Sequence, residues 1–243
     1  MALKTTRHAG LLCTTVSTAL LIAAPASARD GFGGSIAVAT DYLYRGVSRT
    51  RREPAVQGGV EWQSVSGWNA GAWASKVEYL SDMGPRSEID LHLAHAWTLG
   101  PDWSTQVGWT HYLYPNDDGF DYDYDELAVS VSYQQRLTAS IAWSPNTTLF
   151  GNDELVRDKQ AIAYELAVLQ PVDSQLSLAA GVGYYDLSKL FGTGYWYWNA
   201  GLIFTFNAFQ VDVMRIGADG TAADLFEYSA SGGRWSAALS WRF

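Results

Sequence analysis

The last ten residues of the chain, Arg234 to Phe243, alternate between two kinds of side chain. Every second position is apolar, including Trp235, Leu239, Trp241 and Phe243, and arginine or small residues stand between them. A period of two predicts a β-strand with one apolar face and one polar face. Such a strand either packs its apolar face against a second layer or turns that face to lipid as part of a transmembrane barrel.

The N-terminus has the features of an export signal. Lys4 and Arg7 supply positive charge, a short apolar stretch follows, and Ala26-Ser27-Ala28 provides a small-residue cleavage site. The sequence therefore predicts a signal peptide over residues 1–28 and one domain over residues 29–243.

The charge balance after the predicted signal is strongly acidic, with 14 basic against 25 acidic residues and a net charge of −11. This excess argues against a nucleic-acid partner, because binding phosphates requires clustered Lys and Arg. No apolar run after the signal is long enough for a membrane helix. Eleven Trp and fourteen Tyr, with a mean hydropathy near zero, are typical of a transmembrane barrel.

Alternating stretches separated by turn residues recur along the whole chain. Most have about the 9–11 residues that a tilted strand needs to cross a bilayer. Twelve strands are predicted, and bacterial single-chain barrels have an even number. The predicted strands cover residues 34–45, 54–63, 68–79, 88–98, 103–114, 126–134, 137–144, 160–169, 175–185, 195–205, 209–216 and 234–243.

The connections between these strands alternate between long and short. The tight connections are 64–67, 99–102, 135–136, 171–174 and 206–208. The long connections are 46–53, 80–87, 115–125, 145–159, 186–194 and 217–233. An antiparallel up-and-down barrel with short periplasmic turns and long external loops has this pattern. It favours an all-β outer-membrane barrel over a soluble sheet.

Alternation also predicts which side chains face lipid and which face the lumen. Tyr42 is expected to face lipid, and Tyr44, Tyr114, Trp235 and Trp241 are expected in two aromatic belts at headgroup depth. The opposite faces carry more acidic than basic residues, which favours cations in a water-filled lumen. The predicted selectivity residues are Asp41, Arg45, Glu61, Lys76, Glu88, Asp90, Glu126 and Glu165.

Twelve strands leave room for a small pore at most, because eight give a filled interior and sixteen an open channel. The charged residues could instead form an ion-pair network that plugs the lumen. A narrow channel for passive diffusion of small hydrophilic solutes and a non-conducting structural or binding barrel are therefore both open.

Enzymatic and metal sites find less support. His95 and His111 share the lipid-facing parity of adjacent strands and lie far apart along them, so no catalytic grouping with His92 is predicted. A barrel hydrolase is the third alternative. The acidic run from Asp121 to Glu126 lacks the glycine and glutamate spacing of an EF-hand, and a solvated acidic loop is expected there. No cofactor and no metal are predicted.

The basic stretch Ser48-Arg49-Thr50-Arg51-Arg52 is predicted to be an ordinary charged external loop, and contact with lipopolysaccharide phosphates is the alternative. The other expected partners are outer-membrane lipid, small solutes and the barrel-assembly machinery. That machinery would act through the closing strand with Trp235, Leu239, Trp241 and Phe243.

The segment Asp41-Tyr42-Leu43-Tyr44-Arg45-Gly46-Val47-Ser48-Arg49-Thr50, followed by Pro54-Ala55-Val56-Gln57-Gly58-Gly59, resembles the opening hairpin of the TorF family of proteobacterial porins. The resemblance covers about residues 32–243, and weaker matches lie at 87–91, 112–115 and 124–127. It implies an outer-membrane barrel of the porin type, and it supplies neither a substrate nor catalytic residues.

Overall fold

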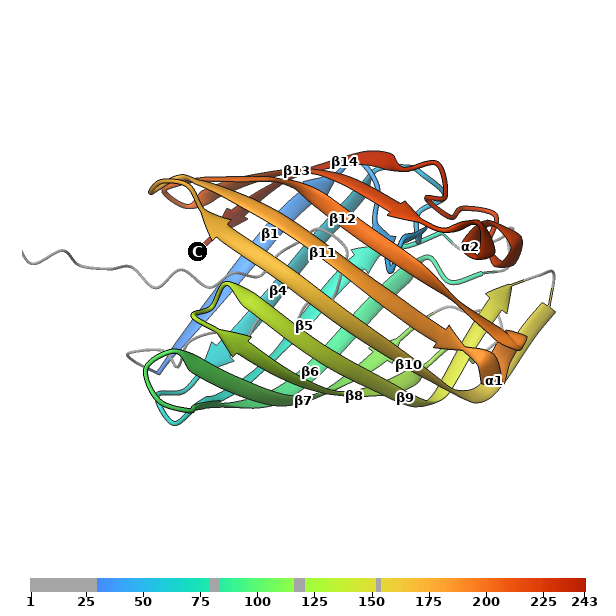
Figure 1. The fold of residues 1–243 in the computed structure, drawn as a ribbon, viewed down its shortest axis with the longest axis horizontal. Helices are drawn as coiled ribbons and strands as arrows, with labels where there is room; N and C mark the ends of the chain where they lie inside the picture. Colours follow the sequence, from blue (N-terminus) through green and yellow to red (C-terminus); the bar gives the residue numbers. More distant parts are fainter. Residues whose placement is uncertain (1–29, 79–83, 116–120, 152–153) are drawn as a thin grey trace, which may run out of the picture.

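The computed structural model describes residues 30–78, 84–115, 121–151 and 154–243. In these ranges, twelve strands form a closed antiparallel barrel in chain order (Figure 1). The predicted twelve-stranded up-and-down barrel is confirmed. The predicted signal peptide lies outside the described residues.

The barrel strands have the following bounds: β1 Gly31–Ala39, β4 Ala55–Gln63, β5 Trp68–Lys76, β6 Ser87–Thr98, β7 Trp103–Leu113, β8 Tyr124–Tyr133, β9 Leu137–Gly151, β10 Glu154–Pro171, β11 Leu176–Leu187, β12 Thr193–Phe206, β13 Phe209–Ala218 and β14 Arg234–Arg242. Two short strands, β2 (Leu43–Tyr44) and β3 (Val47–Ser48), form a separate two-stranded sheet. Two short helices, α1 (Ser188–Phe191) and α2 (Gly220–Leu225), lie in the later long connections.

The barrel closes where β14 pairs with β1, as the C-terminal alternation predicts. Val38 lies opposite Leu239, and Ile36 lies opposite Trp241. Beyond the last strand residue, the Phe243 N–H donates to the Gly34 carbonyl at 3.0 Å and the Gly34 N–H donates to the Phe243 carbonyl at 2.9 Å. The final aromatic residue is thus hydrogen-bonded into the closing seam.

The two ends of the barrel differ as expected. Tight turns lie at the left-hand end of Figure 1, where the chain also ends, and the long connections lie at the other end with α1 and α2. Left-handed backbone angles at Gln134 (φ 51°), Gln135 (φ 56°) and Asn207 (φ 53°) close two of these turns. We call the end with the tight turns the turn end and the opposite end the loop end.

The prediction of a loop over residues 145–159 is wrong for most of that range. β9 continues to Gly151 and β10 starts at Glu154, so the two strands extend the barrel wall at the loop end. Threonine and apolar residues favour extended structure there, and Leu149 packs into the largest interior cluster. The connections 186–194 and 217–233 likewise contain strand residues together with α1 and α2.

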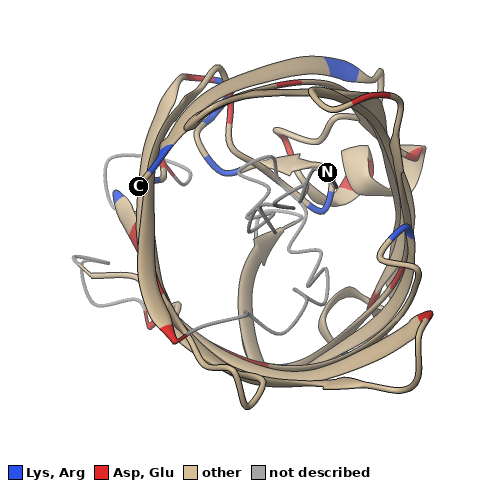
Figure 2. Cartoon of the chain, turned by 90° about the vertical axis from the view of Figure 1, so that its left-hand side faces the viewer, with Lys and Arg blue, Asp and Glu red and all other residues tan. Residues whose placement is uncertain are grey.

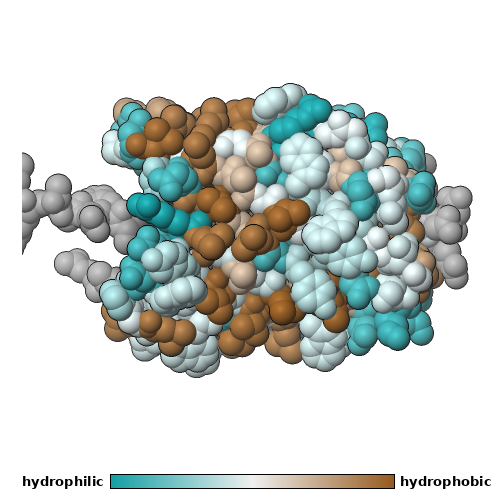
Figure 3. All heavy atoms as spheres, viewed as in Figure 1, coloured by the Kyte–Doolittle hydropathy of each residue, from teal (hydrophilic) through white to brown (hydrophobic). Residues whose placement is uncertain are grey.

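The outward face of the wall is apolar. Val38 (54 %), Leu239 (53 %), Trp235 (65 %) and Trp241 (44 %) keep large exposed fractions outside the barrel. Apolar and aromatic side chains cover most of the middle of the face shown in Figure 3. No helix of the described residues is long and apolar enough to cross a membrane. A contiguous apolar exterior around a closed barrel is the surface that lipid covers.

Candidate functional site

Residues 40–54, between β1 and β4, fold into the barrel, and we call them the inward segment. Chain segments lie within the ring of strands when the barrel is viewed from the turn end (Figure 2). Leu43 and Thr50 have no exposed surface, and Arg45 keeps 1 %. Left-handed angles at Arg45 (φ 48°) and Gly46 (φ 77°) form the two-residue turn between β2 and β3.

This placement corrects three expectations. Tyr42 does not face lipid and Tyr44 is not in an aromatic belt, because both are buried inside the barrel at 6 % and 4 % exposure. The chain leaves the wall after Ala39, so the parity of β1 no longer applies. Arg49, expected in an external loop, is also buried at 8 % and lies over the Tyr44 ring, 4.9 Å from its centroid.

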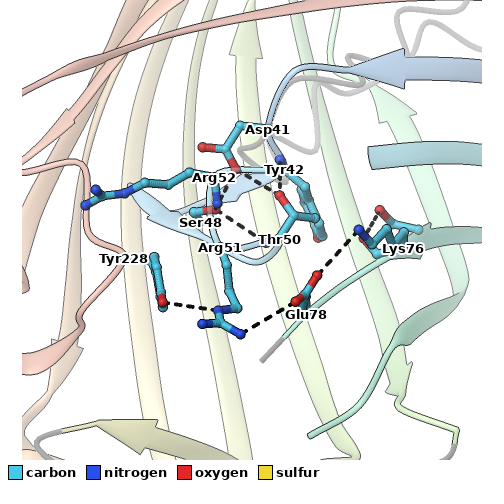
Figure 4. A network of polar contacts seen from close by, with 10 residues as sticks. Asp41, Tyr42, Ser48, Thr50, Arg51, Arg52, Lys76, Glu78 and Tyr228 are labelled. Carbon is cyan, nitrogen blue, oxygen red and sulfur yellow. Dashed lines mark hydrogen bonds and ion pairs between the residues drawn. The ribbon is translucent and has the colours of Figure 1, made fainter. Parts of the chain in front are cut away.

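The inward segment is held in shape by its own polar side chains (Figure 4). The hydroxyls of Ser48 and Thr50 donate to Asp41 Oδ1 at 2.5 and 3.0 Å. The Tyr42 N–H donates to Thr50 Oγ1 at 3.2 Å, and the Arg52 N–H donates to Ser48 Oγ at 2.8 Å. Burial raises the pKa of the Asp41 carboxyl, and these hydroxyl donors oppose the change.

Several strands anchor the segment within the lumen. Arg45 Nη2 lies 2.9 Å from Glu126 Oε2 of β8, and both side chains are buried. The Tyr42 hydroxyl donates to Glu88 Oε1 of β6 at 2.5 Å. Leu43 packs in a cluster with Met214 and Ile216 of β13 together with Ala230. Since four strands separate β13 from β8 on one side and from β6 on the other, the segment crosses the lumen.

At the loop end the segment is tied to the connection that follows α2 and to the residues after β5. The Ser48 N–H donates to the Tyr228 carbonyl at 3.0 Å, and the Glu78 N–H donates to the Arg49 carbonyl at 2.7 Å. Arg51 Nε donates to the Tyr228 hydroxyl at 3.1 Å, and its Nη1 lies 3.6 Å from Glu78 Oε1 (Figure 4). These contacts fix both sides of the segment at the mouth of the barrel.

Tyrosines surround the segment inside the barrel, and none of them was predicted to face the lumen. The Arg45 guanidinium lies over the rings of Tyr44 and Tyr185 at 4.7 and 4.6 Å. Tyr112 of β7 stacks on Tyr124 of β8 with centroids 4.3 Å apart. Strand parity could have identified this pair, because Tyr124 shares its face with Glu126 and lies opposite Tyr112. Other buried members are Tyr114, Tyr122, Tyr195 and Tyr197. Tyr114, expected in a belt, is therefore an interior residue.

The remaining predicted lumen residues lie along the inner wall. Glu165 accepts from the Tyr197 hydroxyl at 2.6 Å and from Ser140 at 3.2 Å. Asp90 follows Glu88 on the inward face of β6, and its buried Oδ1 has no hydrogen-bond partner among the described residues. Glu61 lies nearer the turn end, where it accepts from Gln63 Nε2 at 3.0 Å.

Lys76 is not in the lumen, which corrects its predicted place. Its neighbour Ser75 lies opposite Gln57 and Glu88, and all three are buried on the inward face. Lys76 is one residue further along β5 and therefore points outward, and its exposed ammonium lies 3.5 Å from Glu78 Oε2. β5 alternates weakly because it contains a run of alanine and glycine. The sequence therefore did not show which of its side chains face inward.

His92, His95 and His111 point apart, as predicted. His95 lies opposite Val107 and Trp68 on the outward face, and His111 lies opposite Leu91 on the same face. His111 Nδ1 is 3.0 Å from Asp125 Oδ1. His92 points inward, so the imidazoles do not converge. No group of three or more metal-ligating side chains was found in the described ranges.

Residues 23–240 match the model of a family described as "Bacterial protein of unknown function (Gcw_chp)". The chain belongs to this Gcw_chp family. No curated protein matches the chain.

Solved porins share the fold. The chain is similar to the "NanC porin" with 10 % identity and a TM-score of 0.54, covering 86 % of this chain and 98 % of that one. It is similar to the "KdgM porin" with 7 % identity and a TM-score of 0.53, covering 87 % and 99 %. At these identities the likeness is one of fold, and this Gcw_chp member has the closed barrel of the porins.

Proposed function

We propose that this protein is an outer-membrane channel for passive diffusion of small hydrophilic solutes. The observation that carries the proposal is a closed twelve-stranded barrel with an apolar exterior and an interior that carries ionisable side chains. Barrels of this kind span outer membranes, and their lumens conduct solutes when side chains leave space. The fold shared with porins and the resemblance to the TorF family support the same function, and no catalytic role is assigned to any residue.

The inward segment makes the proposed channel narrow. It places Tyr42, Leu43 and Arg45 across the lumen and ties them to β6, β8 and β13. A solute entering from the loop end must pass beside this segment. Barrel size sets an upper limit on the bore, and the side chains and segments inside decide how much of it remains.

The interior charges favour cations. In the described ranges, seven acidic side chains face the interior against four arginines. The acidic residues are Asp41, Glu61, Glu88, Asp90, Glu126, Glu165 and Asp212, and the basic ones are Arg45, Arg49, Arg234 and Arg242. Excess negative charge along a confined path raises the local concentration of cations. The preference is weak because several charges form pairs, including Arg45 with Glu126.

The location and partners belong to the same proposal. The predicted signal peptide would export the chain, and the closing strand with Trp235, Leu239, Trp241 and Phe243 would be recognised during barrel assembly. Outer-membrane lipid and lipopolysaccharide would surround the exterior, where large apolar side chains are exposed. Arg49 is not available to lipopolysaccharide, because it is buried inside the barrel.

Single-channel recording in a planar bilayer tests the proposal. The wild-type protein and a variant with residues 42–50 replaced by nine Gly and Ser residues are compared in potassium chloride. We expect discrete conductance steps for the wild type and larger steps for the variant, because the replacement removes the anchors at Tyr42 and Arg45.

A second outcome supports the plugged barrel, which the burial of Leu43, Arg45 and Thr50 also favours. In that case the wild type is silent and only the replaced variant conducts. If neither protein conducts although both show the heat-dependent gel migration of folded barrels, the channel proposal is wrong. Equal conductance of the two proteins would mean that the inward segment does not narrow the path.

A further inference from the structure

A pocket opens at the loop end, between the inward segment, the end of β9 and the connection that contains α2. It encloses about 600 Å³ of empty space including its opening to solvent. Its lining includes Tyr44 and Arg49 from the segment and Tyr195, Phe226 and Tyr228 from the opposite side. We call it the mouth pocket.

Aromatic rings form most of the walls of the mouth pocket and are fixed by packing against one another. Tyr195 contacts Tyr185 and Phe226 with ring centroids 5.9 and 5.8 Å apart, and Phe226 packs on Phe191 at 6.0 Å. Tyr195 keeps 1 % of its surface exposed. Because these rings are already ordered, a ligand that lies against them does not have to immobilise them. Such walls suit a flat apolar face.

The charged side chains that line the pocket are Arg49, Glu78 and Glu227, so its net charge is small. Glu78, on the rim, lies 3.6 Å from Arg51 and 3.5 Å from Lys76. Arg51 also donates to the Tyr228 hydroxyl, so the rim is a bridged network of donors and acceptors (Figure 4). At the base, the Arg49 guanidinium lies over the Tyr44 ring. These groups can hydrogen-bond a ligand, and the presence of charges of both signs favours a neutral ligand over an ion.

We propose that the mouth pocket binds a neutral saccharide. A sugar ring combines a flat C–H face, which fits an aromatic wall, with hydroxyl groups that both donate and accept hydrogen bonds. Phe226 would meet the ring face, and Arg49, Glu78 and Tyr228 would meet hydroxyls. The site lies on the outer side of the inward segment, so binding does not depend on whether the barrel conducts.

The test is ligand titration of the folded protein in detergent, followed by isothermal calorimetry and saturation-transfer NMR. The neutral probes are glucose, galactose, mannose, N-acetylglucosamine, maltose and lactose. The charged probes are galacturonate, glucosamine and benzoate. We expect saturable binding of at least one neutral sugar and weaker binding of the charged probes. Absence of saturable binding for every neutral sugar, or preference for benzoate or galacturonate, would overturn the proposal.

Two pairs of variants locate the binding. Phe226→Leu removes a ring from the wall, and Phe209→Leu removes an exposed ring at the turn end. We expect about twofold to tenfold weaker binding for the first and no change for the second. Arg49→Lys, which loses the planar donor array, is paired with Arg52→Lys outside the pocket lining. Unchanged affinity in both Phe226→Leu and Arg49→Lys, with the folded gel migration retained, would show that the sugar binds elsewhere.

Discussion

Arg45 and Glu126 form a buried ion pair that joins the inward segment to β8, with 2.9 Å between Nη2 and Oε2 and side-chain exposures of 1 % and 6 %. The two residues are 81 positions apart in the chain. Two rings, Tyr44 and Tyr185, also contact the guanidinium, and Ser144 donates to the Glu126 carboxylate at 3.2 Å. The Glu126 carboxylate and the two rings compensate the positive charge of the Arg45 guanidinium, which is buried away from water.

Removing one partner of this pair should destabilise the protein strongly. Glu126→Ala leaves the Arg45 guanidinium buried without its counter-charge, which costs about 3–5 kcal/mol. Urea unfolding in lipid vesicles, followed by tryptophan fluorescence, measures the loss. Glu78→Ala is the matched control, because its pairs with Arg51 and Lys76 are partly exposed and contribute at most about 1 kcal/mol. Equal losses in the two variants would contradict a buried role for Glu126.

A second prediction concerns the closing seam. A methyl group on Gly34 would lie 2.7 Å from Cζ and 2.8 Å from Cε2 of the Phe243 ring and 3.1 Å from the Gly59 carbonyl oxygen. Gly34→Ala should therefore turn the exposed Phe243 ring aside and press on the Gly59 carbonyl, which destabilises the barrel by about 1 kcal/mol, the low end of overpacking. Gly31→Ala on the same strand is the control, since no atom of the described residues lies within 4 Å of its added methyl group.

The unfolding free energies of the two variants in detergent provide the comparison. Phe243→Ala combined with Gly34→Ala should recover part of the loss by removing the ring that the methyl group meets. If Gly34→Ala is as stable as Gly31→Ala, the ring of Phe243 does not pack against the seam.

The barrel could be predicted because its signals are local. Period-two alternation and the sorting of long and short connections are visible within a few residues, and together they predicted the barrel that β14 closes by pairing with β1. The inward segment could not be predicted in this way. Tyr42 continues the parity of β1, and only partners distant in sequence, such as Glu88 and Glu126, draw the chain into the lumen.

For the same reason, only some residues of the candidate site were placed correctly from the sequence. Glu88, Glu126 and Glu165 alternate with large apolar residues on well-formed strands, so their inward faces were evident. Lys76 lies on a strand of small residues, where alternation carries little information, and its predicted face was wrong. Arg49 is buried by the fold of the segment, which no local pattern specifies.

A pH-dependent stability should follow from Asp41. Burial raises the pKa of this carboxyl, so the folded state retains its proton at a higher pH than the unfolded chain does. The stability contributed by Asp41 should therefore fall as the pH rises from about 4 through the raised pKa. Relative to Asp41→Asn, the wild type should lose stability across that range.

Asp173 provides a control of opposite sign. Backbone N–H groups of Gln175 and Leu176 lower the pKa of its exposed carboxyl, so its contribution is present at neutral pH and is lost as the pH falls below about 4. Unfolding free energies of both Asn variants between pH 3 and 8 test the two directions. A gap between the wild type and Asp41→Asn that does not change with pH would contradict the prediction.

The last prediction separates inward from outward charges. Glu88→Gln with Asp90→Asn removes two inward carboxylates of β6, and we expect the cation-to-anion permeability ratio to fall by about twofold to threefold. Lys76→Gln removes a charge only one residue beyond the inward-facing Ser75, but on the outer face of the wall. Reversal potentials in a potassium chloride gradient should therefore stay near the wild-type value for Lys76→Gln. If Lys76→Gln shifts the ratio as much as the double variant does, its ammonium lies on the conduction path and the assignment of faces on β5 is wrong.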